Sequence, residues 1–181
     1  MKLKALFAAL AVAAVLPVAA LADEASPSDK ANGARACQAL KAATGLGEAT
    51  FKATYGTNAD KSNAFGKCVS KWTQLEHQNR NVAEAACKAE QADAGFALAH
   101  AGKTFAQFYG VGKQGNNALN RCVQSKRAAE SAADKQAVTN AARKCKAERS
   151  LGATAFVAKY APTDKANAFG KCVSKLSAAK Q

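Results

Sequence analysis

One segment occurs three times along this chain, each time around the second of two cysteines, and this repeat constrains the fold more than any other feature. The nine residues N-A-F-G-K-C-V-S-K at 63–71 return unchanged at 167–175, and a diverged copy, N-A-L-N-R-C-V, stands at 117–123. A Phe four residues before a Tyr lies upstream of each copy. Such self-similarity indicates one structural unit used three times. We therefore divide the chain into a signal peptide (1–22), an N-terminal segment (23–35), repeats at 36–71, 86–126 and 144–175, helical bridges at 72–85 and 127–143, and a tail (176–181).

The sequence between the units favours long helices. The stretches 69–86 and 123–144 contain no Gly and no Pro, and apolar residues in the second recur at helical spacing. We expect one helix from about 116 to 150, roughly 50 Å long, whereas Asn-Arg-Asn at 79–81 leaves a break in the first bridge open. The predicted fold class is all-α, with long Ala-rich helices folded back at three corners as an up-and-down bundle or a short helical solenoid.

A short helix is expected at each corner. Phe and Tyr four residues apart lie on one helical face, and Gly56, Gly110 and Pro162 follow the three tyrosines where a helix would stop. Asp60 or Asp164 is then expected to begin the closing helix. The apolar residues of the closing segments should pack beside the tyrosines, which gives the pairs Phe65 with Tyr55, Leu119 with Tyr109, and Phe169 with Tyr160.

The composition shows why such helices need further support. From residue 23 onward the chain has 38 Ala, only 21 Leu, Val or Phe, and no Ile. Ala favours helix but buries little apolar surface. This thin apolar content, with 26 Lys and Arg against 13 Asp and Glu in the whole chain, approaches that of disordered proteins. It excludes a large α/β enzyme, a β-sandwich and a polytopic membrane protein.

The six cysteines can supply that support as disulfides. If the bridges are helical, Cys68 lies about 28 Å from Cys87, and Cys122 about 34 Å from Cys145, whereas a disulfide tolerates Cα separations of only about 7 Å. The repeat then selects one pair within each unit, and each bond restricts the unfolded chain by about 3 to 4 kcal/mol. A metal site needs closer Cys or His spacing than this chain offers, so we expect no metal. The predicted pairs are Cys37 with Cys68, Cys87 with Cys122, and Cys145 with Cys172.

The first 22 residues read as an export signal. Two lysines are followed by an apolar run from Ala5 to Val18 and then by Ala20-Leu21-Ala22 before Asp23, which matches a basic region, an apolar region and a cleavage site. The run is shorter than the roughly 20 residues that span a bilayer. We expect a secreted or cell-envelope protein with no transmembrane segment after cleavage, in a compartment where disulfides persist.

Three possible chemical motifs have simpler explanations. Gly110 to Gly115 matches G-x-G-x-x-G but lacks the preceding strand that a nucleotide site requires, so we interpret it as a loop and expect no cofactor. His77 and His100 lie outside the repeated positions and are expected to be exposed or next to helix caps, and Trp72 to pack against the first bridge. No nucleophile has a recognisable base, so we expect no enzyme activity.

Basic residues recur at the closing cysteines. Lys67, Arg121 and Lys171 precede them, and Lys71, Lys126 and Lys175 follow about one turn later. These positions predict a non-catalytic binding module for an anionic cell-envelope or extracellular polymer, without sequence-specific nucleic acid recognition. Simple solubility explains the same charges equally well. A structural or protein-interaction role for the Ala-rich helix faces is the alternative, and an exported hydrolase is a third possibility.

The segment N-A-F-G-K-C-V-S, with an upstream Tyr-Gly and an opening Ala-Cys-Lys-Ala-Glu at 86–90, resembles repeats in exported proteins of soil bacteria, particularly actinobacteria. The resemblance covers the three units and not the bridges. It implies a secreted bacterial protein and brings no activity, ligand or active site. The middle unit departs from the pattern, with Leu119 and Asn120 where the others have Phe and Gly.

Overall fold

The computed structural model describes residues 24–163 and 167–178, so the predicted signal peptide and Asp164 lie outside the described residues. Apart from one isolated bridge between Val111 and Asn116, the regular structure of the described residues is helical, which confirms the predicted all-α class. The helices are α1 (Pro27–Lys41), α2 (Glu48–Tyr55), α3 (Ala64–Ala92), α4 (Phe96–Ala99), α5 (Phe105–Tyr109), α6 (Ala118–Leu151), α7 (Ala153–Tyr160) and α8 (Ala168–Ala178).

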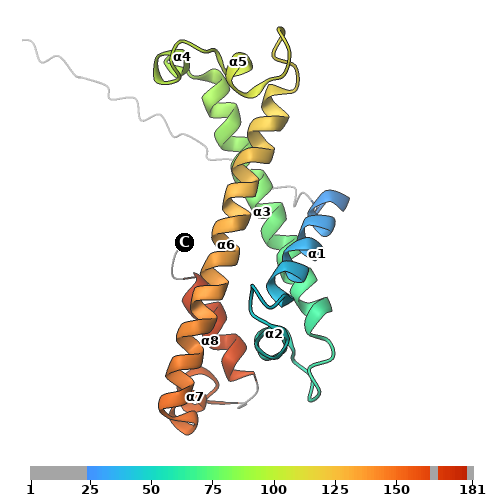
Figure 1. Ribbon diagram of the computed structural model, residues 1–181, viewed down its shortest axis with the longest axis vertical. Coiled ribbons are helices and arrows are strands. Elements are labelled where there is room, and N and C mark those ends of the chain that lie inside the picture. Colours follow the sequence, from blue (N-terminus) through green and yellow to red (C-terminus); the bar gives the residue numbers. More distant parts are fainter. Residues whose placement is uncertain (1–23, 164–166, 179–181) are drawn as a thin grey trace, which may run out of the picture.

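Two long helices form the frame of the molecule. In Figure 1, α3 and α6 run side by side along the long axis as a helical hairpin. The 34 residues of α6 confirm the helix expected from about 116 to 150. The break left open at 79–81 does not occur, because α3 continues through it for 29 residues. Asn79 there donates a hydrogen bond across the hairpin to Asp134 Oδ2 at 2.8 Å, so its polar side chain supports the helix pair.

The three predicted units do not lie in a row. The corner between α3 and α6, which carries α4 and α5, forms one end of the molecule, and α2, α7 and α8 lie toward the other end (Figure 1). The cores follow this division. One cluster of buried side chains joins the first and third units, including Phe51, Trp72, Phe156 and Phe169, and a separate small cluster around Phe96 serves the second.

Each predicted disulfide is present. The bonds join α1 to α3, α3 to α6, and α6 to α8, with Cα separations of 5.9, 6.0 and 6.1 Å. All six cysteines are fully buried. Each bond therefore ties together two helices that meet at a corner. The pairs are Cys37 with Cys68, Cys87 with Cys122, and Cys145 with Cys172.

The corner helices end where the sequence indicates, but the start predicted for the first closing helix is wrong. Gly56 and Gly110 are the C-caps of α2 and α5, and α7 ends two residues before Pro162. Helix α3 begins at Ala64 rather than Asp60. The Asp60 carboxylate instead accepts hydrogen bonds from the backbone N–H and hydroxyl of Ser62, which stabilises a turn and leaves no cap for a helix.

The first and third units meet at a glycine. A Cβ on Gly170 of α8 would lie 2.4 Å from the carbonyl oxygen of Thr54 in α2. The equivalent Gly66, in the identical local sequence, has no such neighbour within 4 Å. Phe169 is accordingly buried, while Phe65 is 39% exposed and packs less completely than expected. The phenylalanine of the same motif is thus buried in the third unit and partly exposed in the first.

Candidate functional site

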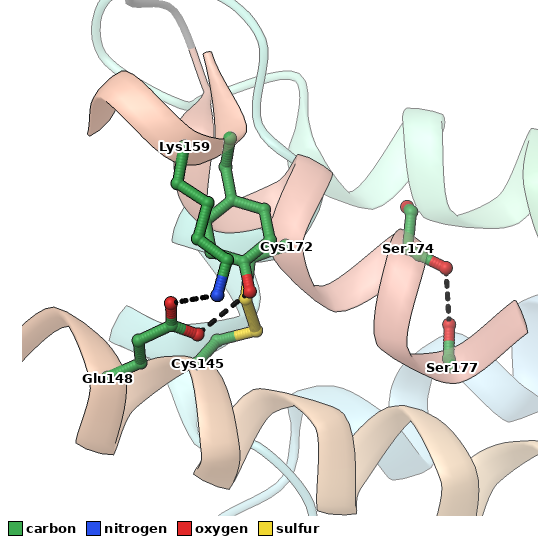
Figure 2. The surroundings of a disulfide bond; sticks show 7 residues. Cys145, Glu148, Lys159, Cys172, Ser174 and Ser177 are labelled. Atoms are coloured by element: carbon green, nitrogen blue, oxygen red, sulfur yellow. Dashed lines mark hydrogen bonds and ion pairs between the residues drawn. A yellow bond between two sulfur atoms is a disulfide. The ribbon is translucent and has the colours of Figure 1, made fainter. Parts of the chain in front are cut away.

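One of the six predicted polyanion-binding residues, Lys71 of α3, reaches across to α8, and three others stand on the same two helices near that contact. The Lys71 ammonium group on α3 donates to the Ser174 hydroxyl on α8 at 3.1 Å. The carbonyl of Ser174 accepts a separate bond from the Ser177 hydroxyl, which Figure 2 shows one turn farther along the helix. We call this surface the α3–α8 seam and define it by Lys67, Lys71, Lys171 and Lys175, which lie within about one turn of that contact.

The electrostatics of the seam favour an anion. The Lys71 amine is partly withdrawn from water between the two helices, and this desolvation lowers its pKa. Its hydrogen-bond partner is the neutral Ser174 hydroxyl rather than a carboxylate. Lys67 and Lys175 are exposed on the same two helices. A bound phosphate, sulfate or carboxylate could accept hydrogen bonds from these ammonium groups.

The remaining two predicted residues lie at the opposite end of the hairpin. Cys122 is about 34 Å along α6 from Cys145, at 1.5 Å per residue. Arg121 beside it donates from Nε to the Tyr109 carbonyl at 2.9 Å. Lys126 pairs with Glu90 at 2.7 Å, and the hydrogen bond that the lysine donates to this carboxylate raises the pKa of the lysine. Neither residue joins the α3–α8 seam.

In the second and third corners, a tyrosine hydroxyl donates a hydrogen bond to a glutamate near the disulfide. Tyr109 donates to Glu90 Oε2 at 2.9 Å, and Tyr160 donates to Glu148 Oε2 at 2.8 Å. Both glutamates stand three residues after the opening cysteine of their unit. Figure 2 shows the third corner, where Lys159 also contacts Glu148, at 2.6 Å, next to the Cys145–Cys172 bond. The repeated glutamate therefore neutralises one lysine and orients one tyrosine.

The first corner uses an apolar version of the same contact. Leu40 takes the place of the glutamate, and Trp72 donates from Nε1 to the Tyr55 hydroxyl at 3.0 Å. Trp72 is 1% exposed, so its expected burial is confirmed, but its hydrogen-bond partner lies on α2 and not on the first bridge. Burial raises the pKa of Tyr55 to about 12, because the ionised phenolate would be poorly solvated there. Replacing the carboxylate by Leu and Trp leaves the lysines of this corner without an acidic neighbour at that position.

Contacts within the protein occupy most of the described carboxylates, and many of the remaining basic residues are exposed on the surface. Glutamates and aspartates on several helices are paired to internal partners: Asp29, Glu48, Glu76, Glu90, Asp134 and Glu148. On the last third of α6 the cations Arg143, Lys144, Lys146 and Arg149 are all exposed. These four lie at the same end of the hairpin as the seam (Figure 1). The excess positive charge is therefore concentrated there.

A buried charge cluster where α1, α3 and α6 meet was missed from the sequence. Asp29 is fully buried, with Arg127 Nη2 at 2.8 Å and Arg80 Nε at 3.4 Å. Glu76, 2% exposed, is paired with Arg127 Nε at 3.0 Å and accepts a bond from the Ser131 hydroxyl. Residues from three helices are thereby held together by charge in a protein with few large apolar side chains.

His77 belongs to this cluster, so the expectation of an exposed histidine is wrong for it. Its Nδ1 lies 2.9 Å from Arg80 Nη2 and 3.6 Å from Asp29 Oδ2, and its side chain is 17% exposed. The expectation holds for His100, which is the C-cap of α4 and stacks on Phe96. The residues of the cluster are far apart in the sequence, and the one local signal is the Ser26-x-x-Asp29 capping box.

Beside the cluster, a groove of about 700 Å³ runs between α1 and α6. The basic side chains Arg35 and Lys135 line it, and Glu76 and Arg127 form part of its wall. The two charged wall residues are already paired with each other, so their charges hold the helices together.

The other predicted motif is structural. The glycines of 110–115 form the loop between α5 and α6, and a Cβ on Gly110 would lie 2.4 Å from the backbone of Gly115.

The described ranges contain no group of three or more His, Cys, Asp or Glu placed to hold a metal. Among the helices of residues 24–163 and 167–178, none combines the length and apolarity needed to cross a membrane.

Comparison of the chain with models of known protein families, with curated proteins and with solved structures found no match.

Proposed function

We propose that this protein is a secreted, non-catalytic binding module for anionic polymers of the cell envelope or the extracellular space, and that the α3–α8 seam is its binding site. The observation that carries the proposal is the contact between Lys71 and Ser174, which brings the closing helices of two units to one surface with a hydroxyl instead of a carboxylate between them. A chain of regularly spaced anions could contact lysines on both helices at once.

Export is part of this proposal. Three buried disulfides suit an oxidising compartment, and the basic and apolar residues at 1–18 suit a signal peptide. In that setting the common polyanions are acidic polysaccharides and polymers linked by phosphate. Neither requires base recognition, and binding through lysine point charges would be strongly dependent on salt.

Heparin chromatography in a salt gradient tests the proposal, using the oxidised chain from residue 23 onward. We expect retention that falls steeply with salt. The variant Lys67→Glu/Lys171→Glu/Lys175→Glu should elute at much lower salt than the parent. The matched control, Lys30→Glu/Lys103→Glu/Lys113→Glu, makes the same change in net charge at exposed sites outside the seam and should elute later than the seam variant. Equal elution of the two variants would show that net charge alone determines retention, and the proposal would then be wrong.

A further inference from the structure

The end of the hairpin opposite the seam carries exposed apolar side chains. In the corner of the second unit, Leu98 is 91% exposed, Phe108 46% and Val111 43%. We call these three residues the apical patch. They stand on α4, on α5 and in the loop that follows α5, which Figure 1 places together at the tip of the hairpin. The corners of the first and third units cover each other through one shared core, whereas this corner has only its own small core.

The aromatic core of this corner holds Phe108 of the apical patch in place. Phe108 packs edge-on against Phe96 with 5.8 Å between ring centroids, and against the His100 ring at 4.5 Å. Phe96 is buried and also contacts Phe105, next to the Cys87–Cys122 bond in the same core cluster. The ring of Phe108 is thus fixed before any partner arrives, so its binding would require little ordering.

The segment that carries the apical patch has charges of one sign, and the carboxylates of Glu90 and Asp93 lie just before it. Between residues 94 and 117 the chain contains no Asp and no Glu, while Lys103 and Lys113 are both exposed in the loops that flank α5. Apolar side chains that point outward beside lysines match the boundary between anionic lipid headgroups and acyl chains, where the apolar groups enter and the ammonium groups stay with the phosphates.

The size of the apical patch also favours a lipid surface over a protein. A stable protein interface uses about 20 to 30 residues on each side, far more than three side chains at the tip of a hairpin. Shallow insertion of a few apolar groups into a bilayer needs no matching surface and no helix that spans the membrane.

We infer that the apical patch inserts into the interface of anionic lipid membranes, with Lys103 and Lys113 against the headgroups. This inference concerns the end of the molecule opposite the seam and does not rest on the proposed function. If this inference and the proposed function both hold, the protein links a membrane surface at one end of the hairpin to an anionic polymer at the other end.

Sedimentation with vesicles tests the inference, using phosphatidylcholine alone and mixed with phosphatidylglycerol. The oxidised chain from residue 23 should bind only the mixed vesicles. Leu98→Gln/Val111→Gln should weaken that binding by about tenfold, because apolar transfer free energy is lost without a change in charge. The matched control Val82→Gln/Leu151→Gln alters two exposed apolar residues away from the tip, which are 62% and 89% exposed, and should bind as the parent does.

Fluorescence gives a second measurement. Trp72 is buried, so a tryptophan introduced by Leu98→Trp reports on the tip against a constant background. Its emission should shift to the blue with mixed vesicles, and that of Leu151→Trp should not. Equal binding to pure phosphatidylcholine, equal loss in the two Gln variants, or self-association abolished by Leu98→Gln would each overturn the inference. The Gln variant of the tip should retain heparin binding, which separates failure of this inference from failure of the proposed function.

Discussion

Single residues show how charge compensates for a thin core. Asp29 and Glu76 are buried carboxylates, and Arg127 contacts both. Burial alone would raise the pKa of Asp29, but hydrogen bonds with Ser26 and the charges of Arg127 and Arg80 outweigh it and lower the pKa below its usual value. The ionised form of Asp29 is therefore the form that the fold stabilises.

This arrangement predicts a loss of stability in acid. Because the folded pKa of Asp29 lies below its unfolded value, the stabilisation is complete above about pH 4 and is lost as pH falls through and below that value. Asp29→Asn should cost about 1 to 3 kcal/mol at pH 7 and reduce the dependence on pH below 4. Urea unfolding followed by Trp72 fluorescence measures both effects. The control Glu130→Gln, at an exposed site on α6, should keep the parent's acid dependence. An unchanged acid dependence in Asp29→Asn would contradict this account.

At the scale of helices, two glycines in identical local sequences should respond in opposite ways to the same substitution. Gly170→Ala places a Cβ 2.4 Å from Thr54 O and must push α8 away from α2, so it should destabilise the fold by about 1 to 3 kcal/mol. Gly66→Ala meets no atom within 4 Å and should stabilise α3 by about 0.5 to 1 kcal/mol. Chemical denaturation of both variants provides the comparison, and changes of the same sign would show that the two units do not differ as described.

Removal of different disulfides should destabilise different parts of the fold. Cys87→Ala/Cys122→Ala removes the bond of the small apical core, and a lost disulfide costs about 2 to 5 kcal/mol. We expect fast hydrogen exchange to appear first in residues 93–117 while α1 and α8 stay protected. Cys37→Ala/Cys68→Ala should instead weaken the core shared by the first and third units. Uniform loss of protection in both variants would argue against two separate cores.

Elements and cysteine pairs could be predicted from the sequence because their causes are local or repeated. The absence of Gly and Pro in the bridges predicts long helices, and the repeat selects the three disulfides. The Asp60 prediction was wrong because its carboxylate bonds to Ser62 in a turn, a competing local interaction that spacing alone does not reveal.

The candidate site could be predicted only in part. The repeated lysines are visible in the sequence, but the contact of Lys71 with Ser174 joins residues 103 positions apart. No periodicity indicates that the third unit packs against the first rather than the second, because that choice depends on Gly170 fitting against α2. The cluster of Asp29, Glu76 and Arg127 was missed for the same reason, since its members come from three different helices.

At the scale of the whole molecule, the hairpin of α3 and α6 separates two surfaces of different chemistry. One end combines the α3–α8 seam with the exposed cations at the end of α6, and the other end carries the apical patch. The two cysteines that mark these ends on α6 are Cys122, which closes the second unit, and Cys145, which opens the third, and they are about 34 Å apart. The hairpin therefore acts as a spacer between the two surfaces proposed to bind partners.

The salt dependence of binding to inorganic polyphosphate tests the central claim most directly. Titration calorimetry at several salt concentrations gives the slope of log affinity against log salt, which reports the number of ion contacts released. We predict a steep slope for the parent, a slope smaller by roughly 0.7 to 0.9 for each charge lost at the seam in Lys67→Gln/Lys171→Gln/Lys175→Gln, and a smaller change for Lys30→Gln/Lys103→Gln/Lys113→Gln. Equal slopes for the two triple variants, or a parent affinity that does not depend on salt, would contradict binding of an anionic polymer at the α3–α8 seam.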